Sequence, residues 1–414
     1  MHYYTLNGKT LISDNEYSLA SISEQQAASC SETVYFLKQL DPMYSRSRYS
    51  VTDKSLLFIE KEGLELIKKT EANNSSLLPE WLKDKIIQSK LTAVNTLYPC
   101  WENQLYAVPP KLWRINVIGL GDVGGTLVSG LRLLGGDIIH SIGIYDIDRN
   151  KVNRWLLECN QILSPDNCTR FPEVVELNED SLFDCDMFVF CVTIGVPPLE
   201  GTAGDVRMMQ LEGNSKIVNI YARKARAAGF KGIFAVVSDP VDILCKSAFL
   251  SSNTDDTGGF DFKGLPSDCI RGYGLGVMHA RAVYYYRQMK QTDDYERYGR
   301  AFGPHGEHLI IANNMLSYDD KLSHELTDRT RNANMEVRAA GYKPYIAPAL
   351  SSGALSLLAT VRGQWHYSAT YMGGVYMGSR NRLTENGTEL EQYDMPDVLW
   401  KRLEKTYNIL RGIM

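Results

Sequence analysis

At 414 residues the chain is too long for one ordinary hydrophobic core and should divide into two or three domains. An apolar content of 44% and a charged content of 22% are typical of a globular protein, and the net charge of −5 disfavours nucleic acid or an anionic membrane as a partner. No apolar run approaches the roughly 20 residues that span a bilayer. The opening residues lack the basic and apolar regions of a signal peptide. We therefore expect a cytoplasmic protein with no membrane partner.

The eight cysteines are dispersed and form no C-x-x-C pair. This pattern is typical of free thiols buried in a protein of a reducing compartment. We predict no disulfide framework and no metal site.

Residues 1–110 contain two periodic stretches, KSLLFIEKEGLELIKKT and LPEWLKDKIIQSKL. The second predicts a helix entered at Pro79, because proline is favoured at a helix start. We interpret this segment as a small α+β module. Three roles stay open for it: covering an active site, mediating assembly, or binding a partner.

A glycine-rich motif follows in RINVIGLGDVGGTLVSGLRLLGG. A β-branched run at 115–118 precedes the motif, and apolar residues at helical spacing follow it. In a dinucleotide-binding unit the first glycine makes the tight turn, the second lets the backbone approach the pyrophosphate, and the third allows close helix–strand packing. The residues predicted to bind the cofactor here are Gly119, Gly121, Asp122, Val123 and Gly124.

A second strand, SIGIYDID, ends on Asp146, twenty-two residues past Gly124. An acid at this distance bonds the ribose hydroxyls of the cofactor. Its charge would repel a 2′-phosphate, which favours NAD over NADP, although Arg149 leaves that preference open. An ordinary carboxylate at a strand end is the alternative interpretation of Asp146.

Three further apolar runs continue the pattern: MFVFCVTIG (187–195), SKIVNIYA (215–222) and GIFAVVSDPVDILCKSAF (232–249). Continuous apolar runs separated by helix-length segments predict buried parallel strands. The polar stretch SSNTDDTGGFD (251–261) predicts a loop near a domain boundary.

The segment VSDPVDIL resembles the V-S-N-P-V-D-I-L of lactate and malate dehydrogenases. That family carries, in order, G-x-G-x-x-G, a mobile loop ending in an arginine, N-P-V-D, D-x-A-R and G-x-H-G-[DE]. Their counterparts here are residues 119–124, GVPPLEGTAGDVRMMQ, SDPVD, GLGVMHARAVYY and GPHGEHL, so the resemblance covers about residues 112–390.

The resemblance implies an α/β fold in which a Rossmann-type doubly wound parallel sheet is followed by an α+β C-terminal domain. We therefore predict an N-terminal module at 1–110, an NAD-binding domain at 111–255 and a substrate domain at 256–414.

By position, His305 matches the histidine that exchanges a proton with the substrate oxygen in that family while a hydride passes to or from the nicotinamide. An imidazole suits this role because it titrates near neutral pH. The alternative is a loop histidine that only caps a strand. The neighbouring His308 is interpreted as a packing or hydrogen-bonding residue, because no third ligand has the spacing of a zinc site.

Three positions depart from the family pattern. Met278 stands where the family has the aspartate that orients the histidine, and Asp239 stands where it has an asparagine that touches the substrate carbonyl. Asp239 either replaces the missing acid or caps a helix with Pro240 at its first position. Lys343, in GYKPY, falls at a threonine near the family's substrate site. It is either a solvated loop lysine or, if it points inward, a partner of Asp239 or of a substrate carboxylate.

Two arginines keep their family positions. Arg281 matches the residue whose planar fork grips the substrate carboxylate, and Arg207 matches the loop arginine that polarises the substrate carbonyl. Between Gly195 and Arg207 there is no arginine to pair with a second carboxylate. A dicarboxylate is therefore disfavoured, and a substrate with an apolar side chain is favoured.

Two classes of function fit these residues. The first is an NAD-dependent oxidoreductase acting on a 2-hydroxy or 2-oxo acid, or on a related imine or bulky ketone. The second is an NAD-binding pseudoenzyme with a sensing or scaffolding role. Retention of both His305 and Arg281 favours the enzyme, whereas Met278 favours the pseudoenzyme. We expect a small-molecule carboxylate as partner, and a homo-oligomer is compatible with the resemblance.

Overall fold

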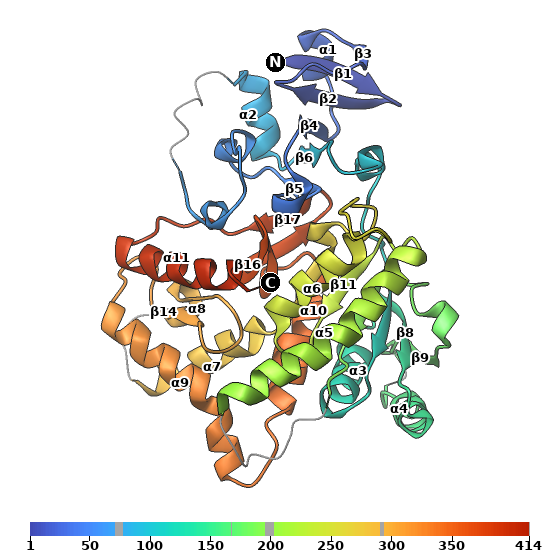
Figure 1. Cartoon of the computed structure of the whole chain (residues 1–414), viewed down its shortest axis with the longest axis vertical. Helices are drawn as coiled ribbons and strands as arrows, with labels where there is room; N and C mark the ends of the chain where they lie inside the picture. The colour runs from blue at the N-terminus through green and yellow to red at the C-terminus, as the bar shows by residue number, and fades with distance from the viewer. Residues whose placement is uncertain (71–77, 167, 195–202, 290–293, 414) are drawn as a thin grey trace.

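The computed structural model describes residues 1–413 except 71–77, 167, 195–202 and 290–293, and describes only the backbone of 203–209 (Figure 1). Among the described residues, one sheet of 15 strands runs through the molecule in the order β3-β1-β2-β4-β6-β5-β17-β16-β15-β12-β11-β10-β7-β8-β9. No helix among these residues is both long and apolar enough to cross a membrane.

The half of the sheet that carries the glycine motif is parallel and has the strand order β9-β8-β7-β10-β11-β12. This is the 3-2-1-4-5-6 order of a doubly wound dinucleotide-binding fold, in which ligands bind where the order reverses, here between β7 and β10. The strands are β7 (Trp113–Ile118), β8 (Ile139–Tyr145), β9 (Glu173–Glu176), β10 (Met187–Phe190), β11 (Ile233–Val236) and β12 (Ile270–Gly272). The parallel sheet thus continues past residue 255, where the sequence placed a domain boundary.

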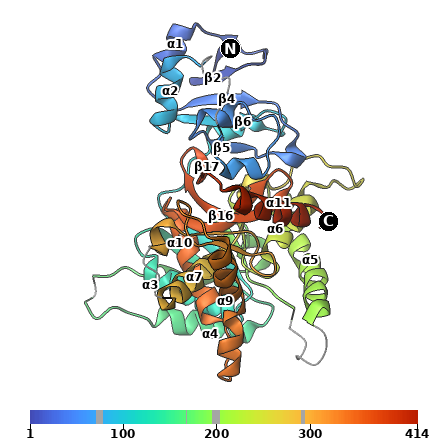
Figure 2. The ribbon, with the colours of Figure 1, turned by 90° about the vertical axis from the view of Figure 1, so that its left-hand side faces the viewer.

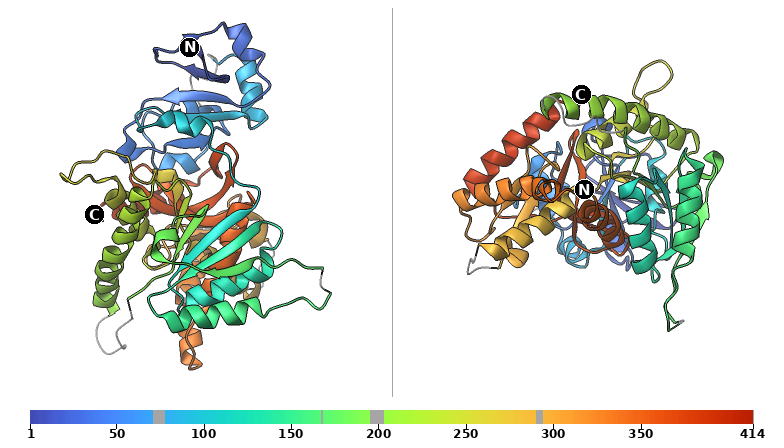
Figure 3. Two further views of the ribbon diagram at one scale, coloured as in Figure 1. Left: turned by 90° about the vertical axis from the view of Figure 1, so that its right-hand side faces the viewer. Right: turned by 90° about the horizontal axis from the view of Figure 1, so that it is seen from below.

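Helices cover both faces of this parallel sheet (Figure 3). Along β7, Ile115 and Val117 pack in one apolar core, and Ile118 packs in the core on the opposite face. Successive side chains of a strand point to opposite faces, so both faces need apolar cover. The helices are α3 (Asp122–Leu134), α4 (Arg149–Asn160), α5 (Ala203–Ala227) and α6 (Val241–Asn253).

The predicted strand SKIVNIYA is wrong, because these residues lie within helix α5. Val218, Ala222 and Ala225 recur at three- and four-residue spacing and are fully buried, whereas the side chain of Lys216 is 73% exposed. This is the periodicity of an amphipathic helix. The eight residues SKIVNIYA are too short by themselves to show the helical period.

The C-terminal part combines helices with an antiparallel extension of the same sheet. β15 pairs antiparallel with β12 and with β16, and β16 pairs with β17. The elements are α7 (Leu275–Gln288), α8 (Tyr295–Tyr298), β13 (Arg300–Phe302), β14 (Ile310–Ala312), α9 (Asp320–Ala339), a π-helix (Pro348–Ala354), α10 (Leu355–Val361), β15 (His366–Met372), β16 (Val375–Thr384), β17 (Gly387–Leu390) and α11 (Asp397–Arg411).

The N-terminal segment is α+β, as predicted, and joins the C-terminal strands at its far edge (Figure 2). Tyr49 of β5 pairs with Thr388 of β17, which makes the sheet continuous. The helix predicted after Pro79 is confirmed, since α2 begins at Glu80. The segment contains β1 (His2–Leu6), β2 (Lys9–Ser13), β3 (Ala20–Ser21), α1 (Glu24–Ala28), β4 (Val34–Lys38), β5 (Arg48–Ser50), α2 (Glu80–Ile87) and β6 (Leu91–Asn95).

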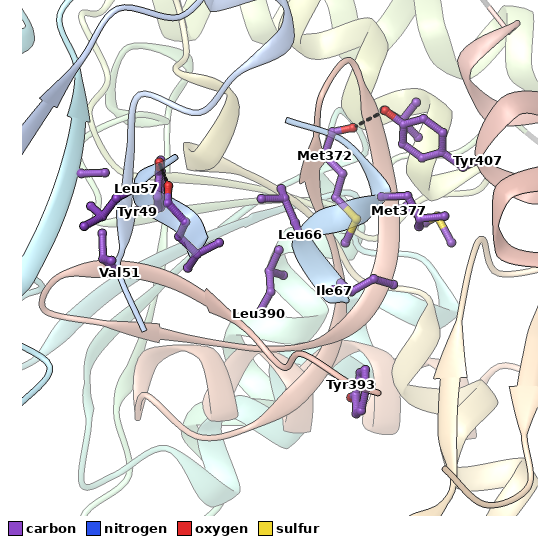
Figure 4. Packing of buried hydrophobic residues seen from close by; sticks show 14 of the residues in the cluster. Tyr49, Val51, Leu57, Leu66, Ile67, Met372, Met377, Leu390, Tyr393 and Tyr407 are labelled. Carbon is purple, nitrogen blue, oxygen red and sulfur yellow. Dashed lines mark hydrogen bonds between the residues drawn. The ribbon is translucent and has the colours of Figure 1, made fainter. Parts of the chain in front are cut away.

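One apolar core is shared by the N-terminal segment and the C-terminal hairpin (Figure 4). The Tyr407 hydroxyl of α11 donates to the carbonyl of Met372 at 2.9 Å within this core. Residues from both parts of the chain contribute to it: Tyr49, Val51, Leu57, Leu66, Ile67, Met372, Met377, Leu390, Tyr393 and Tyr407. Part of the N-terminal segment therefore shares its core with the C-terminal part of the chain.

Candidate active site

The glycine-rich turn joins β7 to α3 at the point where the strand order reverses. Gly119 has φ +86°, and a Cβ there would lie 2.7 Å from the carbonyl carbon of Cys191. A Cβ on Gly124 would lie 1.9 Å from the Gly119 carbonyl oxygen. A Cβ on Gly121 would meet nothing within 4 Å, so this side of the turn is open. The turn therefore has the strain, the close packing and the open approach that a dinucleotide requires.

Asp146 follows β8 and lies against the glycine-rich turn. Its Oδ2 accepts a hydrogen bond from the Leu120 N–H at 2.7 Å, and its Oδ1 accepts one from the Asp148 N–H at 2.9 Å. Its side chain is 7% exposed, and Lys151 Nζ lies 3.7 Å away. The carboxylate thus holds the turn in place, a role that the sequence did not predict. Its contact with a ribose stays a prediction.

Helix α3 begins with Asp122, which is exposed, and Val123, which is partly exposed. Asp122 Oδ2 lies 3.2 Å from Lys343 Nζ, and the lysine side chain is 82% exposed. The sequence had offered Asp239 as the partner of an inward-pointing Lys343. The structure gives Asp122 instead, because the loop after α9 passes beside the start of α3.

The structure brings His305 and Asp239 together. His305 lies in the turn after β13, Asp239 lies three residues after β11, and His305 Nδ1 is 3.0 Å from Asp239 Oδ1. The exposed fractions are 15% for the histidine side chain and 57% for the aspartate side chain. His305 Nε2 is buried and has no hydrogen-bond partner among the described residues. Asp239 therefore holds the imidazole of His305 at Nδ1, and Nε2 could form a hydrogen bond with a bound ligand.

The backbone around this pair explains its placement. Gly274, just before α7, lies so close to His305 that a Cβ there would be 2.8 Å from the histidine Cβ. The alternative in which Asp239 caps a helix is wrong: α6 begins at Val241 with Pro240 as its N-cap, and no side chain caps it. The carboxylate of Asp239 faces His305 rather than the helix.

Arg281 and Met278 lie on successive turns of α7. Arg281 is partly buried, and its Nη1 lies 3.5 Å from Met278 Sδ. Its Nη2 donates to the Asn334 side-chain oxygen of α9. Burial lowers the pKa of the Arg281 guanidinium. Met278 is 2% exposed and packs in an apolar cluster, so this helix gives His305 no carboxylate at that position.

Two other predicted residues have different outcomes. The side chain of Arg207 lies outside the described residues, although its backbone belongs to α5. The His308 carbonyl accepts a hydrogen bond from Thr406 Oγ1 at 3.3 Å. No group of three or more metal-ligating side chains gathers within the described part of the chain.

Comparisons with known proteins agree with the fold and with the predicted NAD-binding domain. Residues 113–258 match the family described as lactate/malate dehydrogenase, NAD binding domain. L-lactate dehydrogenase 2 of Staphylococcus aureus is 23% identical over 333 residues, which cover 73% of this chain and 98% of the relative. The chain resembles the lactate/malate dehydrogenases. Most of its parallel half matches the NAD-binding domain of that family.

Solved structures show the same fold. A lactate dehydrogenase from a Medee basin deep-sea metagenome library aligns with a TM-score of 0.59 and 17% identity, over 73% of this chain and 98% of that one. The malate dehydrogenase of Archaeoglobus fulgidus in complex with NADH aligns with a TM-score of 0.57 and 19% identity, over 72% and 98%. About a quarter of this chain lies outside each alignment.

The sequence analysis did not single out Asp242, a buried acid beside His305. It is 5% exposed and lies in the first turn of α6. Burial raises the pKa of Asp242 to about 7, the His305 charge and backbone lower it, and Asp239 raises it. Its only signal in the sequence is its place in SDPVD, three residues after Asp239.

We expect Asp242 to make the stability of the fold depend on pH. Its pKa in the folded state, about 7, lies above the value of 3.8 for a solvent-exposed aspartate, so the folded state keeps a proton that the unfolded chain loses. Stability should therefore be greatest below about pH 4 for this group and fall as the pH rises to about 7, by up to roughly 4 kcal/mol. Asp242→Asn should remove this loss. Melting temperatures of both proteins between pH 5 and pH 8 measure it, and parallel pH curves would contradict it.

Asn214 of α5 was also missed. Its side-chain nitrogen donates to the Asp239 carbonyl at 2.8 Å, and its oxygen accepts from the Ile194 N–H at 2.9 Å. Ser238 Oγ donates to the Val192 carbonyl at 2.7 Å and ties the same two segments. Asn214 is fully buried, so these bonds replace its bonds to water. A single asparagine on a helix carries no sequence signal for this function.

Proposed function

We propose that this protein transfers a hydride between NAD and the oxygen-bearing carbon of a 2-hydroxy or 2-oxo acid, with His305 as acid and base. The 3.0 Å contact between His305 Nδ1 and Asp239 Oδ1 carries the proposal. It pairs the histidine with a carboxylate although Met278 has replaced the family's acid on α7. Proton transfer by His305 needs a group that orients its ring, and Asp239 would replace the family's acid in that role.

The residues that would hold NAD fit it. The turn from Gly119 to Gly124 and the first N–H groups of α3 would face the diphosphate, and Asp146 would lie at the ribose. When bound, NAD supplies the hydride acceptor or donor. A negative charge at Asp146 favours a cofactor without a 2′-phosphate, and therefore NAD.

His305 would move the proton at Nε2. In oxidation, the substrate hydroxyl would give its proton to Nε2, and the carbon that bears the hydroxyl would give its hydride to oxidised NAD. In reduction, the carbonyl carbon would receive the hydride and the oxygen would receive the proton from Nε2. Asp239 would accept a hydrogen bond from the Nδ1–H, which fixes the tautomer with its lone pair on Nε2. The carboxylate also stabilises the imidazolium that forms.

Arg281 would bind the substrate carboxylate. Its guanidinium lies partly buried on α7, where it loses water and gains from pairing with an anion. Arg207 would polarise the substrate carbonyl, a role that rests on the resemblance alone. We favour a substrate with an apolar side chain, because no arginine between Gly195 and Arg207 could pair with a second carboxylate. An imine or a bulky ketone also fits the proposal, because Asp239 stands where the family has an asparagine that would donate to a carbonyl.

The proposed setting is the cytoplasm, with a small-molecule carboxylate as the partner and a homo-oligomer as the assembly. The eight cysteines are free in the structure, which is compatible with a reducing compartment.

Loss of NADH absorbance tests the proposal. The purified protein is mixed with NADH or NADPH and with 2-oxo acids that carry small, branched, aromatic or acidic side chains. We expect NADH to be consumed faster than NADPH, and apolar side chains to be preferred over acidic ones. If NADH binds but no 2-oxo acid, imine or ketone consumes it, the pseudoenzyme alternative replaces the enzyme.

A further inference from the structure

An ion pair links the C-terminal part of the chain to the glycine-rich turn. Lys343 Nζ, from the loop after α9, lies 3.2 Å from Oδ2 of Asp122, the first residue of α3. The two residues are 221 positions apart in the sequence. The C-terminal part of the chain thus places a cation, Lys343, beside the turn.

The backbone on both sides of this pair is fixed by close packing. Gly341, with φ +86°, ends α9, and its N–H donates to the Arg338 carbonyl at 2.9 Å. The π-helix that follows packs on α3, where a Cβ on Gly130 would lie 2.7 Å from the Ala354 Cβ. The loop that carries Lys343 is thus held beside the start of α3.

The charges at this turn point to an anion. The N–H groups at the start of α3 and the open side of Gly121 are where the cofactor's diphosphate belongs, and the carboxylate of Asp122 alone would oppose it. Lys343 cancels that charge and has two further N–H donors. Because the side chains are 82% and 53% exposed, the pair contributes little to folding.

We propose that Lys343, which lies beside Asp122 at the turn, binds the diphosphate of NAD from the C-terminal part of the chain. The proposal rests on NAD as the cofactor and is independent of the reaction proposed above. It assigns Lys343 to the cofactor rather than to the substrate carboxylate.

The dissociation constant of NADH, measured by fluorescence, tests this. Lys343→Met should raise it about tenfold, the effect of losing one charge-assisted contact, and Lys343→Arg should largely restore it. The same loss should occur in the Asp122→Asn background. It should also occur for ADP-ribose, which keeps the diphosphate, but not for adenosine, which lacks it.

Lys69→Met is the matched control, because Lys69 and Asp394 form an exposed ion pair of the same 3.2 Å length far from the turn. An equal NADH affinity for Lys343→Met and Lys69→Met would overturn the proposal. So would a loss that disappears in the Asp122→Asn background, since Lys343 would then only neutralise Asp122. An equal loss for adenosine would show that the change acts outside the diphosphate site.

Discussion

His305→Asn should lower kcat by about 10²- to 10⁴-fold, the usual contribution of a positioned acid or base. Asparagine keeps a polar side chain of similar reach but cannot exchange a proton at Nε2. The NADH dissociation constant should change little, because His305 contacts Asp239 and Gly274 and is not part of the glycine-rich turn. Steady-state rates and fluorescence titration of the same preparation measure the two effects separately.

Asp239→Asn should also cut kcat strongly, since an amide can present its N–H to Nδ1 and stabilise the wrong tautomer. The double variant should be little worse than His305→Asn, because both residues act through one proton transfer. Multiplicative losses would show that Asp239 and His305 act independently, which would contradict the pairing seen at 3.0 Å.

His308→Asn is the control for this loop. His308 lies three residues beyond His305 and contacts the protein through its carbonyl. Its replacement should leave kcat nearly unchanged. If His305→Asn keeps the full rate, the loop is a turn that happens to carry histidines.

Arg281→Lys should raise the KM for a carboxylate substrate by about ten- to a hundredfold. Lysine keeps the charge but loses the planar fork that holds both carboxylate oxygens. NADH affinity should not change, because Arg281 lies on α7 and not at the turn. Initial rates over a range of substrate concentrations measure KM.

Arg287→Lys gives the matched control, since Arg287 lies on the same helix, is 70% exposed and pairs with Glu296. It should leave KM unchanged. An enzyme that turns over substrates without a carboxylate and is indifferent to Arg281→Lys would remove this arginine from the substrate site.

The sequence predicted most of the NAD-binding domain because glycines and apolar strands leave local signals. Gly119 and Gly124 stand where no other residue fits, and this requirement is visible in their spacing. The run at 215–222 was wrongly predicted as a strand because five apolar residues among polar ones fit either period in so short a window. These residues are helical because they lie within the long helix α5, which extends over Ala203–Ala227.

The site was only partly predictable for a different reason. His305 and Asp239 are far apart in the sequence, and their pairing could be inferred only because the resemblance placed both strand ends at one cleft. Asp242 and Asn214 act through burial and through bonds to backbone groups, which no residue pattern records. The partner of Lys343 depended on how the π-helix packs on α3, a contact set by the small residues at Gly130 and Gly353.

The most direct measurement uses NADH that carries deuterium at the transferable position of its nicotinamide ring. The protein is incubated with a 2-oxo acid that bears an apolar side chain, and the product is analysed by mass spectrometry and NMR. We predict that deuterium appears on the carbon next to the carboxylate of a 2-hydroxy acid, and that His305→Asn forms this product far more slowly while still binding NADH. Bound NADH that never delivers its deuterium to any 2-oxo acid would contradict hydride transfer by this protein.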